Sequence, residues 1–165
     1  SDILPTLCEL AGRPVPDRPL DGISLKPLID GEMKERPRPI CFWSFNFNRD
    51  ANHTPYIDPK LHERTTPLVK MMAGRYTRNF RNFHHEEINE QDYQGTRVIL
   101  DNQYKLILEG PRDSETKKEL FNLHSDPAEE NNLMDQKPEM AGKMEKQLEN
   151  WQQSVLKSLT GVDYK

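Results

Sequence analysis

Two short apolar runs joined by only three residues constrain the fold of this chain more than any other feature. Residues 96–100 (TRVIL) and 104–108 (YKLIL) have the composition of β-strands. Asp101, Asn102 and Gln103 connect them, and such residues accept the backbone conformations of tight turns. Because so short a connection returns the chain alongside itself, the two strands are expected to pair antiparallel.

Further elements extend this hairpin. An aromatic run at residues 40–45 predicts a strand before it, and residues 119–123 predict one after it. Pro138 suits the first turn of a long final helix, and Gly161 suits its end. Between them an apolar stripe steps by three or four positions: Met140, Met144, Leu148, Trp151, Val155 and Leu159. The pattern predicts an α+β fold, a small antiparallel sheet of about four strands with the long C-terminal amphipathic helix packed on it.

The chain opens on another helical pattern. Residues 3–11 carry apolar side chains at helical spacing, with Asp2 as the expected N-cap and Gly12 just past the end. Ser24 is expected to cap a short helix over residues 25–29. Since an independent protein rarely begins one residue before a capped helix, we expect residue 1 to be a cut within a longer protein. The alternative is a natural leader removed by processing.

Composition predicts a thin hydrophobic core. With the 8 glycines added to the 34% of hydrophobic residues, about 39% of the 165 residues are apolar and 30% are charged, against roughly 45–50% and 25% in ordinary globular domains. We therefore expect part of the apolar surface of the chain to pack against another domain or protein. No apolar window is long enough to cross a bilayer, and the net charge of −4 does not favour nucleic acid. Neither a membrane nor a nucleic-acid partner is expected.

No self-sufficient catalytic or metal-binding motif is present. The sequence lacks GxSxG, HExxH, a phosphate-binding loop, CxxC and an EF-hand loop. Cys8 and Cys41 are far apart and are interpreted as small buried hydrophobic residues rather than nucleophiles. His84 and His85 are adjacent, so on a helix or strand they point apart, which disfavours a shared metal.

A basic segment stands out in this acidic chain. Residues 64–85 carry five Lys or Arg and no Asp or Glu, which leaves −9 on the remainder. Arginines recur every third residue on a helix expected to begin at Thr66, and guanidinium groups bind sulfate, phosphate or carboxylate bidentately. The candidate substrate-binding residues are Arg75, Arg78, Arg81, His84 and His85. The alternative is a solvated helix face, or one paired with acidic neighbours.

Four stretches, in this order, match a recognisable series of motifs. Residues 2–12 fit D-hydrophobic-x-P-T-hydrophobic…A-G, and residues 20–25 fit L-D-G-x-S-L. Residues 104–107 fit y-K-L-i, and residues 119–133 fit E-L-y-d-L…D-P-x-E-x-x-N-L. The chain thereby resembles the C-terminal part of the type I sulfatases, the formylglycine-dependent sulfate-ester hydrolases. The likeness is greatest to the branch of arylsulfatase A and N-acetylgalactosamine-6-sulfatase.

The resemblance implies a domain organisation and a cellular context. Residues 1–35 would end an alkaline-phosphatase-like catalytic domain and its linker, and residues 36–165 would form the C-terminal subdomain. Within the subdomain, a variable basic segment at residues 46–95 would separate the first strand from the hairpin. The parent enzyme would act on sulfated carbohydrate. It would be exported to the periplasm, the cell exterior or the lysosome.

The resemblance also implies which groups this chain lacks. Sulfatase catalysis needs a C/S-x-P-x-R motif, whose Cys or Ser becomes formylglycine beside a Ca²⁺ ion. No Cys or Ser of this chain starts that motif. Formylglycine and Ca²⁺ are thus implied only in the parent enzyme, in a missing N-terminal catalytic domain of the same chain. No catalytic or metal-binding residue is assigned here.

Three interpretations remain. The chain is a sulfatase subdomain, inactive alone, that serves in packing and substrate selection. Alternatively it is a non-enzymatic module of the same fold that binds anions or glycans. In the third interpretation it is an interaction domain whose apolar face pairs with itself.

Overall fold

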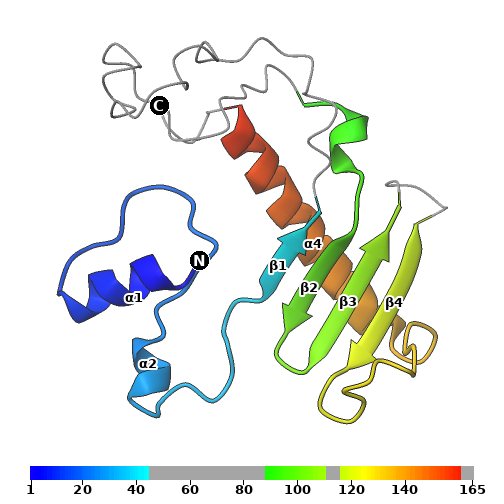
Figure 1. The fold of residues 1–165 in the computed structure, drawn as a ribbon, viewed down its shortest axis with the longest axis horizontal. Coiled ribbons are helices and arrows are strands. Elements are labelled where there is room, and N and C mark those ends of the chain that lie inside the picture. The colour runs from blue at the N-terminus through cyan, green and yellow to red at the C-terminus, as the bar shows by residue number, and fades with distance from the viewer. Residues whose placement is uncertain (45–87, 111–115, 161–165) are drawn as a thin grey trace, which may run out of the picture.

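The computed structural model describes residues 1–44, 88–110 and 116–160 (Figure 1). The elements, in chain order, are α1 (Ile3–Leu10), α2 (Lys26–Ile29), β1 (Ile40–Trp43), the 3₁₀ turn η3 (Glu90–Tyr93), β2 (Arg97–Asp101), β3 (Tyr104–Glu109), β4 (Lys117–Asn122) and α4 (Pro138–Leu159). Figure 1 shows α4 behind the sheet, and α1 and α2 to one side, beyond β1.

The sheet is a four-stranded antiparallel meander in the order β1-β2-β3-β4. Asn102 and Gln103 form the turn between β2 and β3, and Asn102 takes the positive φ of 53° that the turn requires. Together with α4 this arrangement confirms the predicted α+β fold. No helix of the described residues is long and apolar enough to cross a membrane.

The core lies between one face of the sheet and α4. Ile99, Leu106 and Leu120 from three neighbouring strands are fully buried there, and α4 buries Met144 and Leu148 against them. The predicted helix stripe is confirmed as far as Trp151, which also packs on this core, but it is wrong at Val155. The prediction placed only apolar residues on the buried face of the helix. In the structure the polar Gln152 and then Leu156 are buried, and Val155 is only partly buried.

The helix ends differ in detail from expectation. Gly12 follows α1 with a φ of 62°, as predicted. Asp2 precedes α1, but its carboxylate makes no capping bond to that helix. Ser24 does accept a hydrogen bond from the Lys26 backbone N–H at 3.1 Å, although α2 begins one residue later than predicted.

The segment after β4 is held by a turn. Asp126 organises this turn. Its carboxylate oxygens accept the backbone N–H groups of Glu130 and Asn131, at 3.2 and 2.8 Å. The Leu133 N–H then donates to the Leu120 carbonyl at 2.8 Å, and Leu133 packs on the core.

Candidate functional site

The residues predicted from sequence to bind substrate lie outside the described part of the chain. They are Arg75, Arg78, Arg81, His84 and His85, together with the helix expected from Thr66. Their proposed role in binding an anionic substrate therefore stays a prediction.

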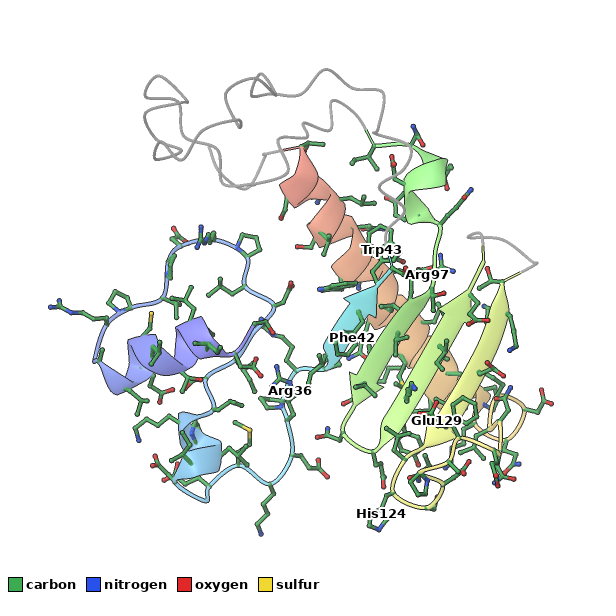
Figure 2. The ribbon with its side chains drawn as sticks, in the orientation of Figure 1. Arg36, Phe42, Trp43, Arg97, His124 and Glu129 are labelled. Atoms are coloured by element: carbon green, nitrogen blue, oxygen red, sulfur yellow. The ribbon has the colours of Figure 1, made fainter. Side chains whose placement is uncertain are left out.

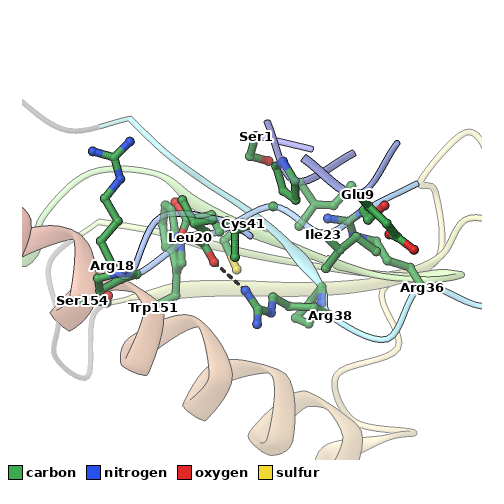
Figure 3. Close-up of a pocket in the computed structure, with 18 of the residues that line it drawn as sticks. Ser1, Glu9, Arg18, Leu20, Ile23, Arg36, Arg38, Cys41, Trp151 and Ser154 are labelled. Carbon is green, nitrogen blue, oxygen red and sulfur yellow. Dashed lines mark hydrogen bonds between the residues drawn. The ribbon is translucent and has the colours of Figure 1, made fainter. Parts of the chain in front are cut away.

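The described residues enclose one large cleft beside the edge strand β1, with a volume of about 980 Å³ (Figure 3). We call it the junction cleft, because the N-terminal segment (residues 1–30) forms one wall, while the start of β1 and helix α4 form the other. Residues from both walls are labelled in Figure 3, among them Arg18, Leu20, Ile23, Arg38, Cys41 and Trp151.

Arg36, which lines the junction cleft, is paired with Asp2. The two carboxylate oxygens of Asp2 accept hydrogen bonds from the two terminal guanidinium nitrogens of Arg36, each at 2.8 Å. The Ile23 backbone N–H donates to the same carboxylate at 2.9 Å. The Arg36 guanidinium, more than the backbone bond, holds the pKa of the Asp2 carboxyl below its ordinary value.

Other polar contacts join the walls or brace the N-terminal segment. The Trp151 indole N–H on α4 donates to the Asp21 carboxylate at 3.0 Å. The Arg38 guanidinium donates to the Leu20 carbonyl, a bond drawn in Figure 3. Within the N-terminal segment, the Thr6 hydroxyl oxygen accepts the Leu25 backbone N–H at 2.9 Å. These polar contacts position the N-terminal segment against the sheet.

Cys41 is the one thiol that lines the junction cleft. It is half-buried and packs against the core. Burial, with the nearby Asp21 charge as a smaller cause, raises the pKa of the Cys41 thiol to about 12. The side chain is therefore protonated at neutral pH and unsuited to nucleophilic attack, in line with the apolar role predicted for it.

The junction cleft has the chemistry of a structural joint rather than of a reaction centre. Among residues 1–44, 88–110 and 116–160, no group of three His, Cys, Asp or Glu side chains is placed to hold a metal ion. Sequence reasoning missed both the Asp2–Arg36 and the Asp21–Trp151 contact. The available signal was that both aspartates fall in the motif-bearing stretches at residues 2–12 and 20–25.

No protein-family model and no curated protein matches this sequence significantly. Solved structures do match. The chain superposes on yidJ of Bacteroides fragilis, which bears a sulfatase name, with a TM-score of 0.55 and 14% identity, covering 99% of this chain and 26% of that one. It superposes on Ps i-CgsB with a TM-score of 0.51 and 18% identity, covering 93% and 24%.

A third structure is BT4656 in complex with its substrate D-glucosamine-2-N,6-O-disulfate. The TM-score is 0.50 and the identity 17%, over 93% of this chain and 23% of that one. At these identities the matches show a shared fold, and they confirm the predicted resemblance to sulfatases at that level. The chain spans only about a quarter of the length of the structures it matches.

Proposed function

We propose that this chain is the C-terminal part of a sulfatase that hydrolyses sulfate esters of carbohydrates, and that it is inactive alone. One observation carries the proposal: the fold matches sulfatase structures over 93% or more of this chain but over only 23–26% of theirs. The sequence supports it, because the C/S-x-P-x-R motif occurs nowhere in the chain.

Formylglycine and Ca²⁺ would belong to the rest of the parent enzyme. The described residues do not fit either group, since they offer no cluster of metal ligands and Cys41 is held protonated. No catalytic step is assigned to this chain. In the proposed organisation, residues 1–35 complete the catalytic domain and residues 36–165 form the smaller subdomain.

The exposed face of α1 supports a missing partner domain. Ile3, Leu7 and Leu10 are 75%, 58% and 55% exposed, and on α2 Leu28 and Ile29 are 53% and 68% exposed. So many large apolar side chains on two short helices form a patch of the kind that marks an interface. In the proposed enzyme this patch packs on the catalytic domain of the same chain.

A substitution at Leu7 tests whether this patch packs on the catalytic domain. Leu7→Ser should leave the stability of the 165-residue chain unchanged, because the side chain is already 58% exposed. In the longer protein the same change should cost about 2 kcal/mol or more, because it removes a buried apolar side chain. Equal effects in the two proteins, measured by urea denaturation, would mean that α1 stays solvent-exposed.

The basic segment is assigned to substrate selection. Its five positive charges oppose an acidic remainder, and such a charge pattern steers polyanions such as sulfated glycans. Neutralising Arg75, Arg78 and Arg81 together in the parent enzyme should lower kcat/KM for a sulfated glycan and flatten its salt dependence. If kcat/KM and its salt dependence were both unchanged, the basic segment would not be part of the substrate-binding surface. The parent enzyme is expected to be exported.

The decisive assay compares two proteins on one substrate. D-glucosamine-2-N,6-O-disulfate is offered to the 165-residue chain and to a longer protein that includes the residues encoded upstream of Ser1, and sulfate release is measured. We expect release only by the longer protein. If neither protein releases sulfate from a panel of sulfated sugars while the 165-residue chain binds them, the glycan-binding module is the better description.

A further inference from the structure

The sheet carries apolar side chains on both of its faces. Partners across antiparallel strands lie on the same face, so the row of Cys41, Ile99, Leu106 and Leu120 faces α4 and the core. The next row belongs to the opposite face and contains Phe42, Val98 and Ile107. The face without α4 therefore repeats the aliphatic and aromatic character of the core side.

The side chains on that opposite face form a continuous surface over three strands. We call it the outer patch; its residues are Ile40 and Phe42 on β1, Val98 and Leu100 on β2, and Ile107 on β3. Phe42 is 52% exposed, and the other four side chains are partly exposed. Figure 2 labels Phe42 on β1, on the side of the sheet that is turned away from α4.

Charged pairs limit the outer patch towards β4. Lys105 is bonded to both carboxylate oxygens of Glu129 at 2.7 Å, and Lys117 lies 3.0 Å from Glu119. Phe121 on this face is only 5% exposed, so it is already covered within the chain. The exposed apolar area is thus confined to β1, β2 and the adjoining part of β3, with a polar border beside it.

A sheet with two apolar faces is typical of the middle layer of a three-layer arrangement. A single exposed phenylalanine would need no explanation, but five adjacent apolar side chains on one sheet face indicate a contact surface. The charged border resembles the polar rim that surrounds the apolar centre of protein interfaces.

We propose that the outer patch is a docking surface for the remaining part of a longer sulfatase-like chain, which packs an apolar layer on β1 to β3. This inference rests on the proposed function. Two observations select this occupant: the matched structures are about four times as long as this chain, and the patch begins on β1, the first strand after the N-terminal segment that carries the exposed face of α1. One partner can therefore cover both apolar surfaces.

Hydroxyl-radical footprinting with mass spectrometry tests the inference without any mutation. Oxidation of Phe42 is compared in the 165-residue chain and in the longer protein, with the exposed His124 as the matched control. We expect Phe42 to react at least about fivefold more slowly in the longer protein, because the centre of an interface loses its solvent contact. His124 should react equally in both.

Two results would overturn the inference. In one, Phe42 is oxidised equally fast in both proteins. In the other, Phe42 is already protected in the dilute 165-residue chain, which would mean that the chain itself or a second copy covers the patch. Sulfate release is measured on the same samples. Hydrolysis with an unprotected Phe42 overturns only the docking surface, and protection without hydrolysis overturns only the enzymatic proposal.

A pair of charge variants provides a second readout. Phe42→Asp should be tolerated by the 165-residue chain, whose position 42 is half in solvent, but should lower the thermal stability of the longer protein. Lys117→Asp, in the charged border on β4 rather than in the outer patch, should behave alike in both proteins. If Phe42→Asp is also harmless in the longer protein, the outer patch is not an interface.

Discussion

Asp2 and Arg36 are bonded by two parallel hydrogen bonds of 2.8 Å, although 34 positions separate them in the sequence. Paired bonds of this kind fix direction as well as distance, because the planar guanidinium matches the carboxylate. The residue before α1 is thereby bonded to a residue shortly before β1. The contact holds α1 in a defined position while leaving its apolar face exposed.

Removing the charge of Asp2 should loosen this connection. Asp2→Asn leaves the Arg36 guanidinium without its carboxylate, and we expect the free energy of unfolding to fall by about 1–2 kcal/mol. Tryptophan fluorescence in urea measures the change, since Trp151, one of the two tryptophans of the chain, lines the junction cleft. The matched control is Asp30→Asn, which breaks the exposed pair with Lys26 and should change nothing measurable. Equal effects would assign no special role to Asp2.

The same pair should make stability depend on pH. The pKa of Asp2 is lower in the folded chain than in the unfolded one, so its contribution is present above the unfolded value of about 3.9. That contribution is lost as the pH falls through the lower folded pKa. The stability difference between the wild type and Asp2→Asn should therefore shrink as the pH falls below about 4. A difference that is constant over this range contradicts the assignment.

Gly95 should be intolerant of substitution. Its φ is 101°, and a Cβ there would lie 2.2 Å from the Ser44 carbonyl oxygen. Gly95→Ala should cost about 3 kcal/mol, since backbone strain adds to the clash. Gly142→Ala is the control, because nothing lies within 4 Å of its Cβ position in α4. Gly142→Ala should stabilise the chain by about 1 kcal/mol. Thermal denaturation of the two variants measures the loss of stability in one and the gain in the other.

Cys41 should resist alkylation in the folded chain. With a pKa of about 12, its thiolate fraction near pH 7.5 is about three thousandfold below that of an ordinary thiol of pKa about 8.5. Iodoacetamide followed by peptide mass spectrometry should label Cys41 rapidly only after denaturation. Rapid labelling of the native chain would show that the thiol is ionised, and would reopen a chemical role for it.

The secondary structure was largely predictable because local patterns determine it. The polar residues after Leu100 favour a hairpin, although Asp101 still belongs to β2, and Pro138 suits the first turn of the helix that follows it. Where the outcome depends on partners, prediction failed. Asp2 has the side chain of an N-cap, but Arg36 and the Ile23 N–H compete successfully for its carboxylate. Gln152 reads as a surface residue and is only 2% exposed.

The candidate site was less predictable than the fold. Sequence patterns pointed to Arg75 and its neighbours, which lie outside the described residues. The junction cleft depends on contacts between distant positions, such as Asp21 with Trp151, and no spacing rule links residues 130 positions apart. The low apolar content predicted that part of the packing surface would need a partner. It did not predict that this surface would be the exposed face of α1.

The meander order of the sheet also determines when each part can assemble. β2 and β3 are separated only by Asn102 and Gln103, whereas residues 44–96 separate β1 from β2. Closing a longer loop costs more conformational entropy, so the β2–β4 unit can form from near-neighbour contacts while β1 pairs later. The junction cleft, which needs β1 in place, should then be the last feature to appear during refolding.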